Sequence, residues 1–316
     1  MKNKKKSNKI KIAIFILIIL SSLFVFIIWA RKPEHLGGLI DNIEMLFNHN
    51  QFSDSYNAKS LVLLDLSNDK DFISKNVEDK QLPASLAKLF VIEYASTFTD
   101  LDDIVSVNST SLSLTKQGSS VANIKEKEYY LQNLFAAMLV PSGNDAAYAV
   151  ADYCGSILSK ESKTTKERIN IFMNNLNKYL EKEGYVNTKL YDPSGYDMDA
   201  QTTVLDLAKL VKKLLKHQWF RDIVSQSSYT AILPDGSKQT WKNTNIFLDS
   251  TSEYYNENVL GVKTGSLSDD YNLIVLYKKH GKEFLICSLG SQSNTSRYDD
   301  VSYILKTIDE SDYLKK

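Results

Sequence analysis

The hydrophobic positions of this chain follow three spacings: an unbroken apolar run near the N-terminus, helical periodicity in the middle, and short apolar stretches before and after that middle. The unbroken run, residues 12–30, has nineteen residues without a charge. At about 1.5 Å per residue, such a helix comes close to the ~30 Å thickness of the hydrocarbon layer of a membrane. We therefore predict one transmembrane helix at residues 12–30.

The residues before this run set its expected orientation. Residues 1–11 carry six lysines and no acid, and positive charge favours the cytoplasmic side of a membrane. We predict a cytoplasmic basic tail at residues 1–11 and a single-pass anchor in the cell membrane, with everything after Arg31 on the extracytoplasmic face. A cleaved signal peptide is the main alternative, but its apolar region normally has about 7–15 residues, and Ile28 and Ala30 make a weak cleavage site.

Residues 31–57 are polar and mixed in character, and we predict a linker there. After it, apolar residues recur at the spacings typical of helices and strands. Strands are predicted at residues 60–66, 272–279 and 282–290, with another short one after a turn at 67–70, and helices at residues 83–96, 129–140, 142–155, 166–184, 203–220 and 297–309. No repeat or low-complexity stretch separates these elements, so we expect the early and late strands to share one sheet around a helical middle. Residues 58–316 are thus predicted to form one domain.

Charge and composition narrow the function classes. The formal net charge is zero, but without the six lysines of residues 1–11 the chain has 32 basic and 38 acidic residues. Such a balance gives no reason to expect a nucleic-acid partner. The four histidines are scattered without the spacing of metal ligands, so neither a metal nor a cofactor is predicted. The two cysteines, Cys154 and Cys287, leave open whether they pair or stay as buried thiols.

The first candidate for chemistry is the stretch PASLAKLF at residues 83–90, which carries Ser85 and Lys88. Residues three apart lie on the same face of a helix, so the hydroxyl and the amine can meet. The same spacing occurs at two further Ser/Lys pairs, Ser67/Lys70 and Ser113/Lys116. The spacing alone therefore does not identify a site.

Two further motifs follow in the same chain. PSGN, between two predicted helices, gives Ser142 and Asn144, and GVKTGS, at the end of an apolar stretch, gives Lys263, Thr264 and Gly265. Ser-x-x-Lys, Ser-x-Asn and Lys-Thr-Gly in this order are typical of penicillin-binding proteins and class A β-lactamases. Each motif is weak alone, but three in this order, on a predicted helix, turn and strand, argue against coincidence.

Longer stretches make the resemblance more specific. PASLAKLF, LFAAMLVPSGNDAA, YDPSGY with TTVLDLAKL, and LGVKTG resemble the low-molecular-mass D-alanyl-D-alanine carboxypeptidases, a family of serine peptidases among the penicillin-binding proteins. The resemblance covers roughly residues 58–309. It implies an α+β fold of the β-lactamase/transpeptidase type, in which helices flank a five-stranded antiparallel sheet and the active site lies at one sheet edge.

The resemblance also implies roles for the first two motifs. Ser85 would be acylated, Lys88 would take its proton, Ser142 would pass protons to the leaving amine, and Asn144 would orient Lys88 and the substrate amide. A lysine can act as a base only if its pKa falls well below its usual value of about 10.4, and burial has that effect. The physical chemistry and the resemblance therefore agree on Lys88.

The third motif would hold the substrate. The resemblance implies that Lys263 and Thr264 bind the terminal carboxylate of D-alanine. Gly265 would let the peptide lie against its strand, because a side chain there would block it. Ser266 would contribute its backbone N–H to an oxyanion hole together with that of Ser85. The implied partners are peptidoglycan stem peptides ending in D-Ala-D-Ala, β-lactam antibiotics as inhibitors, and the lipid bilayer through residues 12–30.

Two other functions remain as alternatives. A β-lactamase-like hydrolase of class A would need a Glu-x-x-Leu-Asn loop, and between Asn144 and Lys263 only Glu167 comes near that pattern, with the wrong spacing. A non-catalytic binder of cell-wall peptides would be expected to lack Ser85 or Lys88, and both are present. The segment after Lys-Thr-Gly, SLSDDYNLI at residues 266–274, departs from the family pattern, so the preferred stem peptide stays open.

Overall fold

The structure is a computed structural model that describes residues 55–68, 70–159, 161 and 163–311. The predicted basic tail, the predicted transmembrane helix and all but the end of the predicted linker lie outside the described residues. Among the described residues, none of the helices is both long and apolar enough to cross a membrane. The segment Ser53–Lys316 forms one compact unit.

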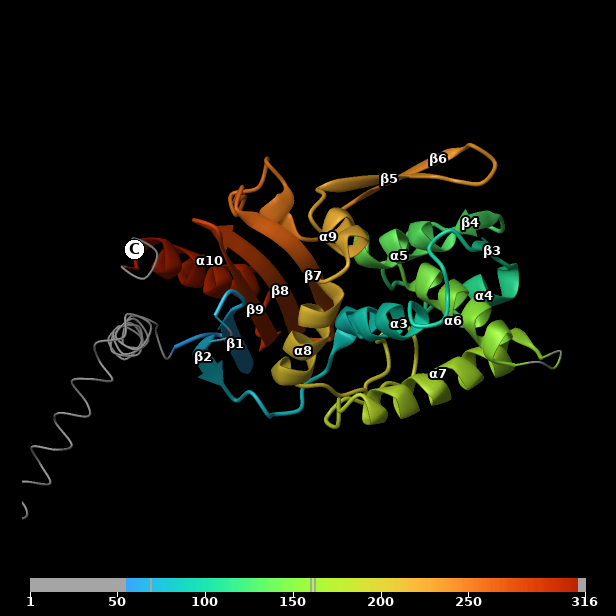
Figure 1. Ribbon diagram of the computed structural model, residues 1–316, viewed down its shortest axis with the longest axis horizontal. Coiled ribbons are helices and arrows are strands. Elements are labelled where there is room, and N and C mark those ends of the chain that lie inside the picture. Colours follow the sequence, from blue (N-terminus) through green and yellow to red (C-terminus); the bar gives the residue numbers. More distant parts are fainter. Residues whose placement is uncertain (1–54, 69, 160, 162, 312–316) are drawn as a thin grey trace, which may run out of the picture. The chain divides into compact units, whose positions relative to one another are not determined.

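A five-stranded antiparallel sheet forms the centre of this unit (Figure 1). Its order is β2-β1-β9-β8-β7, so the first strand of the unit lies between the second strand and the last one. The strands are β1 (Ser60–Asp65), β2 (Lys70–Lys75), β7 (Val259–Leu267), β8 (Asp270–Lys279) and β9 (Lys282–Ser291). The predicted α+β fold with a five-stranded antiparallel sheet is confirmed.

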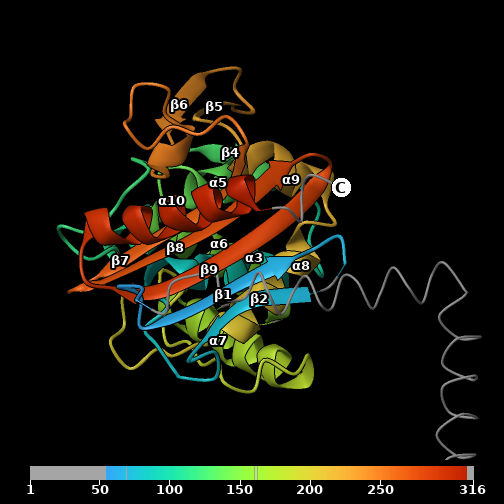
Figure 2. The same ribbon diagram turned by 90° about the vertical axis from the view of Figure 1, so that its left-hand side faces the viewer.

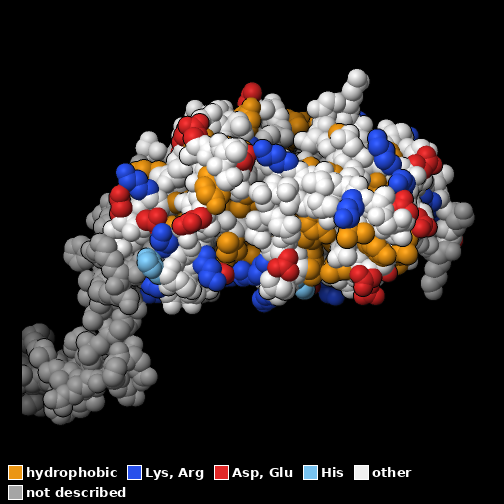
Figure 3. All heavy atoms as spheres, turned by 90° about the horizontal axis from the view of Figure 1, so that it is seen from above, with side chains coloured by type: hydrophobic (Ala, Val, Ile, Leu, Met, Phe, Trp, Pro, Cys, Tyr) orange, Lys and Arg blue, Asp and Glu red, His pale blue; other side chains and the backbone are white. Residues whose placement is uncertain are grey.

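Helices pack against both faces of the sheet (Figure 2). Helix α10 (Asn294–Glu310) contacts β8 and β9 on one face, and α8 (Val204–Leu214) contacts β1 and β9 on the other. The remaining helical elements are η2 (Ala84–Leu86), α3 (Ala87–Ala95), α4 (Ser109–Ser113), α5 (Leu131–Leu139), α6 (Asn144–Leu158), α7 (Thr165–Lys182), α9 (Gln218–Val224) and η3 (Ile246–Leu248). Seen from above, basic and acidic side chains are interspersed over the surface (Figure 3).

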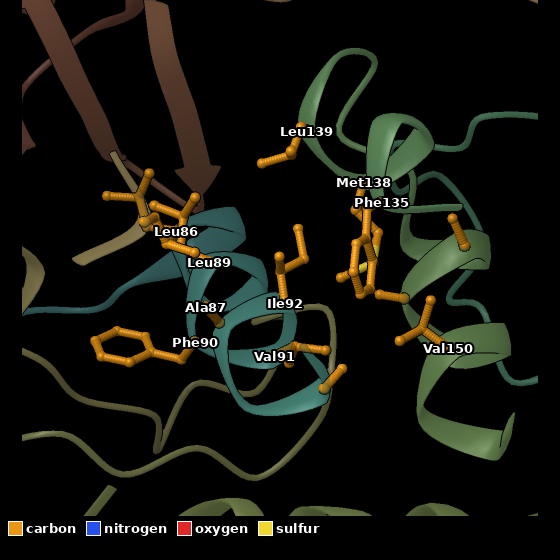
Figure 4. Close-up of a cluster of buried hydrophobic side chains, with 14 of the residues drawn as sticks. Leu86, Ala87, Leu89, Phe90, Val91, Ile92, Phe135, Met138, Leu139 and Val150 are labelled. Carbon is orange, nitrogen blue, oxygen red and sulfur yellow. The ribbon is translucent and has the colours of Figure 1, made fainter. Parts of the chain in front are cut away.

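Helix α3 lies inside the core, because all nine of its residues are buried. A helix that is apolar on nearly every side is stable only when other elements surround it. Figure 4 shows Ile92 of α3 facing Phe135 and Met138 of α5, with Val150 of α6 beyond them. Each fully buried side chain of this size stabilises the fold by about 1.5–3 kcal/mol. This packing fixes the position of the N-terminal end of α3, where Ser85 and Lys88 lie.

Two small two-stranded sheets were not predicted, namely β3 (Ile104–Ser106) with β4 (Glu128–Tyr130) and the hairpin of β5 (Ser228–Ile232) with β6 (Lys238–Lys242). The first pair is only three residues long in each strand. In the second pair, Ala231 and Trp241 are the only buried residues. Neither pair therefore has enough buried apolar residues to stand out as a pair of strands in the sequence.

The predicted helix at residues 203–220 is wrong in its second half. Helix α8 ends at Leu214, and α9 begins at Gln218 after His217, whose backbone is extended at φ −92° and ψ 119°. Leu215 and Phe220, on the two sides of the break, are both buried. The apolar pattern therefore continues across the break and hides it.

Candidate active site

Ser85 and Lys88 meet at the start of the central helix. Ser85 lies in the short turn η2, and Lys88 lies in the first turn of α3. Their side chains are in contact, with Lys88 Nζ 2.8 Å from Ser85 Oγ. The other two Ser/Lys pairs lie elsewhere, since Ser67 lies in the β1–β2 turn, Lys70 begins β2, and Ser113 ends α4.

Lys88 is fully buried and has three oxygen partners. Besides Ser85 Oγ, its Nζ contacts Asn144 Oδ1 at 2.7 Å and the backbone carbonyl of Ser194 at 2.9 Å. Burial lowers the pKa of Lys88 to about 7, against the opposing charges of Asp192 and Asp145. Near neutral pH the amine is therefore often unprotonated, which a proton acceptor next to a serine requires.

Ser142 and Lys263 form a second pair in the same site. Lys263 lies on β7 and is 1% exposed, and its Nζ donates to Ser142 Oγ at 2.7 Å and to the carbonyl of Thr264 at 2.9 Å. Burial, together with the positive charges of Lys88 and Arg297, lowers the pKa of Lys263 well below its usual value. Lys263, which was predicted to bind the substrate carboxylate, thus contacts the hydroxyl of Ser142.

The edge strand β7 packs directly on the turn that carries Ser85. A Cβ on Gly265 would lie 3.1 Å from the carbonyl oxygen of Pro83 and 3.3 Å from Ser85 N. A side chain at residue 265 would therefore press on the turn that carries Ser85, in addition to taking room from a ligand. Thr264 Oγ1 shares a hydrogen bond with Thr244 Oγ1 at 2.7 Å.

The two serine-bearing turns contain residues with left-handed backbone. Ala84, which precedes Ser85, has φ 47°, and Ser142 itself has φ 65°. This conformation costs about 1–2 kcal/mol for a residue with a Cβ. The surrounding packing has to hold both turns in place, as is common where side chains are positioned for chemistry.

A pocket of about 270 Å³ opens at the site. It is lined by Ser85, Gly118, Ser119, Ser120, Asn144, Ser194, Gly195, Tyr196, Ser266, Leu267, Ser268 and Tyr271. A larger hollow of about 670 Å³ lies beside α8, but none of the predicted site residues lines it. The smaller pocket, which Ser85, Asn144 and Ser266 line, is therefore the candidate ligand pocket.

The eight predicted site residues come together from three parts of the chain. Ser85, Lys88 and Asn144 are joined by hydrogen bonds, as are Ser142 and Lys263. Thr264 and Gly265 follow Lys263 along β7, and Ser266 lines the pocket with Ser85. In the described part of the chain no cluster of His, Cys, Asp and Glu could hold a metal ion. Cys154 and Cys287 are both free and buried.

Three residues of the site were given no role from the sequence. Ser194 supplies the carbonyl to Lys88, and Asp192 accepts hydrogen bonds from the loop around it. The Asp-Pro-Ser-Gly pattern is typical of a side-chain-capped turn and could have drawn attention to this loop. Arg297 of α10 is 5% exposed and donates to the carbonyls of Gly265 and Asn272, both at 3.0 Å. No local sequence pattern marks this arginine.

Two residues of the segment that differs from the family pattern, Asp270 and Tyr271, have different surroundings. Asp270 forms an ion pair with Lys59 at 2.5 Å, which directs its carboxylate to the start of β1. Tyr271 lines the pocket, and the guanidinium of Arg297 lies 5.7 Å from the centre of its ring. Of these two residues, Tyr271 is the one in a position to contact a ligand.

Comparison with known proteins gives consistent results. The profile of a family described as D-alanyl-D-alanine carboxypeptidase matches residues 48–292. A D-alanyl-D-alanine carboxypeptidase of Streptomyces sp. strain K15 is 32% identical over 182 residues, which is 55% of this chain and 59% of the relative. The D-alanyl-D-alanine carboxypeptidase DacC of Escherichia coli K12 is 28% identical over 264 residues, which is 79% of this chain and 61% of the relative. The chain thus spans about three fifths of the length of these relatives.

Solved structures agree with the sequence comparison. The crystal structure of the Streptomyces K15 DD-transpeptidase superposes with a TM-score of 0.71 at 25% identity, covering 81% of this chain and 98% of that one. Penicillin-binding protein D2 of Listeria monocytogenes, in its ampicillin-bound form, superposes with a TM-score of 0.62 at 21% identity, with the same two coverages. At this lower identity, the second likeness supports the fold alone.

Proposed function

This chain belongs to the D-alanyl-D-alanine carboxypeptidase family, and from that premise we propose that it is a serine peptidase that removes the terminal D-alanine from peptidoglycan stem peptides through an acyl-enzyme. The observation that carries the proposal is the buried amine of Lys88, with its pKa lowered to about 7, at 2.8 Å from Ser85 Oγ. A hydroxyl and a neutral amine at this distance are suited to nucleophilic catalysis.

In the acylation step, Ser85 Oγ attacks the carbonyl carbon of the last peptide bond while its proton moves to Lys88 Nζ. The electron pair of the C=O double bond moves onto oxygen and returns when the C–N bond breaks. D-alanine leaves as an amine after receiving a proton. The backbone N–H groups of Ser85 and Ser266 are the proposed oxyanion hole, and the support is that both residues line the pocket.

The second pair of residues serves the leaving group. The Ser142 hydroxyl, in contact with Lys263 Nζ at 2.7 Å, is the proposed route of the proton to the departing amine. The buried guanidinium of Arg297 places positive charge beside β7. A carboxylate bound next to Lys263 would raise the lowered pKa of this amine, so that Lys263, Arg297 and Thr264 together favour the terminal carboxylate of the substrate. In the deacylation step, water adds its OH to the acyl carbon and its remaining proton returns to Ser85 Oγ.

The position of β7 at the sheet edge supports binding of an extended peptide. Strand β7 pairs with β8 on one side only. The backbone groups on its other side can therefore pair with a peptide strand. We propose that the stem peptide lies along β7 with its D-alanyl end at Ser85. A β-lactam, which resembles this end of the substrate, should bind in the same place.

The test is covalent labelling with a fluorescent penicillin. The purified full-length chain should become labelled, and sequencing of the labelled peptide should identify Ser85, while Ser85→Ala should abolish labelling. The wild-type protein should also release free D-alanine from a pentapeptide that ends in D-Ala-D-Ala. Label on another residue, or none on a folded protein, would argue for a non-catalytic binder of wall peptides. Rapid loss of label with release of opened penicillin would favour a β-lactamase-like hydrolase.

We also propose that the protein is held in the cell membrane by residues 12–30, with the enzyme on the extracytoplasmic face. The support is the nineteen-residue apolar run after six lysines. Protease added to intact cells should digest the domain and leave the cytoplasmic tail. Protection of the domain in unbroken cells, or release of a shortened form into the medium, would contradict this arrangement.

A further inference from the structure

A loop at residues 191–197 brings a backbone carbonyl against the amine of Lys88. The carbonyl oxygen of Ser194 accepts an N–H of Lys88 Nζ at 2.9 Å, and Ser194 is 2% exposed. The side chain of Asp192 determines the shape of this loop. One carboxylate oxygen accepts from Ser194 N at 2.7 Å, from Gly195 N at 3.0 Å and from the Ser194 hydroxyl, and the other accepts from Asp197 N at 2.7 Å.

The partners of Lys88 differ in what they can do in a hydrogen bond. A neutral lysine amine has two N–H groups and one lone pair. Asn144 Oδ1 at 2.7 Å and the Ser194 carbonyl at 2.9 Å can only accept, so each takes one N–H. The Ser85 hydroxyl, at 2.8 Å, is the one of the three partners that can donate. With both acceptors in place, the lone pair of the amine is therefore turned toward the proton of Ser85.

The same loop also contacts the turn that carries Ser85. A Cβ on Gly195 would lie 1.9 Å from the carbonyl oxygen of Ala84, so the loop backbone is seated directly on the residue before the nucleophile. Gly195 has φ 78°, a conformation that favours glycine. Capping by Asp192 thus holds in place a loop that touches both the base and the turn of the nucleophile.

We propose that Asp192 is a positioning residue for the proton transfer from Ser85: by capping the 191–197 loop it aims the Ser194 carbonyl at Lys88, and thereby directs the lone pair of the neutral amine to the serine hydroxyl. This inference rests on the proposed function, because it assigns a direction to a step of that reaction. Asp192 does not line the pocket, and its carboxylate accepts hydrogen bonds from the 191–197 loop. Its negative charge has a second effect, since it raises the pKa of Lys88 against the lowering by burial.

The two effects of Asp192 can be separated by two substitutions. Asp192→Asn removes the charge, and because the amide has one accepting atom it also breaks the cap. The plateau rate of Ser85 acylation by penicillin should fall about 10- to 100-fold, as expected for a misdirected reacting group, and the acid limb of its pH profile should move to lower pH. Asp192→Glu keeps the charge but displaces the cap. Its plateau should fall similarly, with the acid limb nearly unmoved.

The matched control is Asp199→Asn, which removes an exposed carboxylate two residues beyond the loop. Its plateau and its acid limb should equal those of the wild type. Circular dichroism of each variant gives the folded fraction by which rates are corrected. Plateau rates in Asp192→Asn and Asp192→Glu that match the wild type after this correction would overturn the proposal, as would a fall that the unfolded fraction accounts for entirely.

A second readout does not depend on activity. In protein with ¹³C-labelled lysine, the Cε signal that is lost in Lys88→Ala reports the titration of Lys88. Its midpoint should move to lower pH in Asp192→Asn and stay in place in Asp199→Asn. An unchanged midpoint in Asp192→Asn would contradict the effect of the Asp192 charge on Lys88, whereas the positioning role is decided by the plateau rates. If penicillin fails to label wild-type Ser85, the proposed function is wrong, and the titration still decides whether Asp192 acts on Lys88.

Discussion

Lys88 and Lys263 lie close enough together that a positive charge on Lys88 lowers the pKa of Lys263. Both amines are buried, and each contacts a different serine, Ser85 and Ser142 respectively. Two buried like charges disfavour each other strongly. The site is therefore arranged to hold at least one neutral amine at neutral pH, which is what a serine nucleophile paired with a lysine needs.

The first prediction concerns the pH dependence of acylation. Only the neutral amine of Lys88 can accept the proton of Ser85, and its pKa is lowered to about 7, mainly by burial. The rate of acylation by penicillin should therefore rise with pH and reach half of its plateau near pH 7. Stopped-flow measurements between pH 5 and about 9 would check this. A midpoint near the ordinary lysine value would rule out Lys88 as the base.

Removal of the amine gives the second prediction. Lys88→Ala should slow acylation by about 10²- to 10⁴-fold, since the loss of a general base has effects of that size. Lys70→Ala and Lys116→Ala, which alter the two other Ser-x-x-Lys pairs, serve as controls and should react like the wild type. Equal losses in all three variants would mean that the spacing has no special meaning at Ser85.

The third prediction concerns the carboxylate of the substrate. Lys263→Ala should lower kcat/KM for the peptide by about 10- to 150-fold, corresponding to a charge-assisted contact of roughly 1.5–3 kcal/mol. Amidation of the peptide C-terminus should impose a similar loss on the wild type and little further loss on the variant. Because Lys263 Nζ contacts Ser142 Oγ, discrimination between acid and amide that survives in Lys263→Ala would assign the lysine to proton transfer alone.

Burial of Lys88 should also make stability depend on pH. Its pKa is about 7 in the folded protein and has the ordinary value of 10.5 in the unfolded chain. Between these values the unfolded chain holds a proton that the folded protein has released, so this group makes the free energy of unfolding rise with pH, by up to about 1.4 kcal/mol per pH unit. Urea unfolding should show wild type gaining stability relative to Lys88→Met from pH 7 to 10. A pH-independent difference would contradict the lowered pKa.

The fifth prediction uses two glycines with the same backbone conformation. Gly195 has φ 78° and Gly236 has φ 80°, but only Gly195 has a neighbour, Ala84 O, in the space that a Cβ would occupy. Both alanine substitutions should cost about 1–2 kcal/mol of backbone strain. Gly195→Ala should cost roughly 1–3 kcal/mol more because of overpacking, and should slow acylation. Similar melting temperatures for the two variants would show that the 191–197 loop can move away from the Ala84 carbonyl without loss of stability.

The sequence predicted the elements that have strong apolar patterns and the residues that belong to motifs. The early and late strands and the buried helix with Ser85 and Lys88 are present as predicted. The hairpin at Tyr229 and Trp241 was missed because most of its residues are exposed. The contacts of Ser194 and Arg297 were missed for another reason: they join segments far apart in the chain, and the residue type alone does not reveal a partner 106 or 32 positions away.

The order of strands in the sheet affects when the domain can become complete. Strand β1 pairs with β2, which follows it at once, and with β9, whose first residue, Lys282, comes after almost the whole domain. A ribosome makes the chain from its N-terminus, so the residues of β1 and β2 are present long before those of β9. Pairings between segments so distant in sequence form slowly. The exposed edge of β1 must therefore stay unpaired until the last part of the chain has been made, and chaperones that bind extended segments would have their clearest target there.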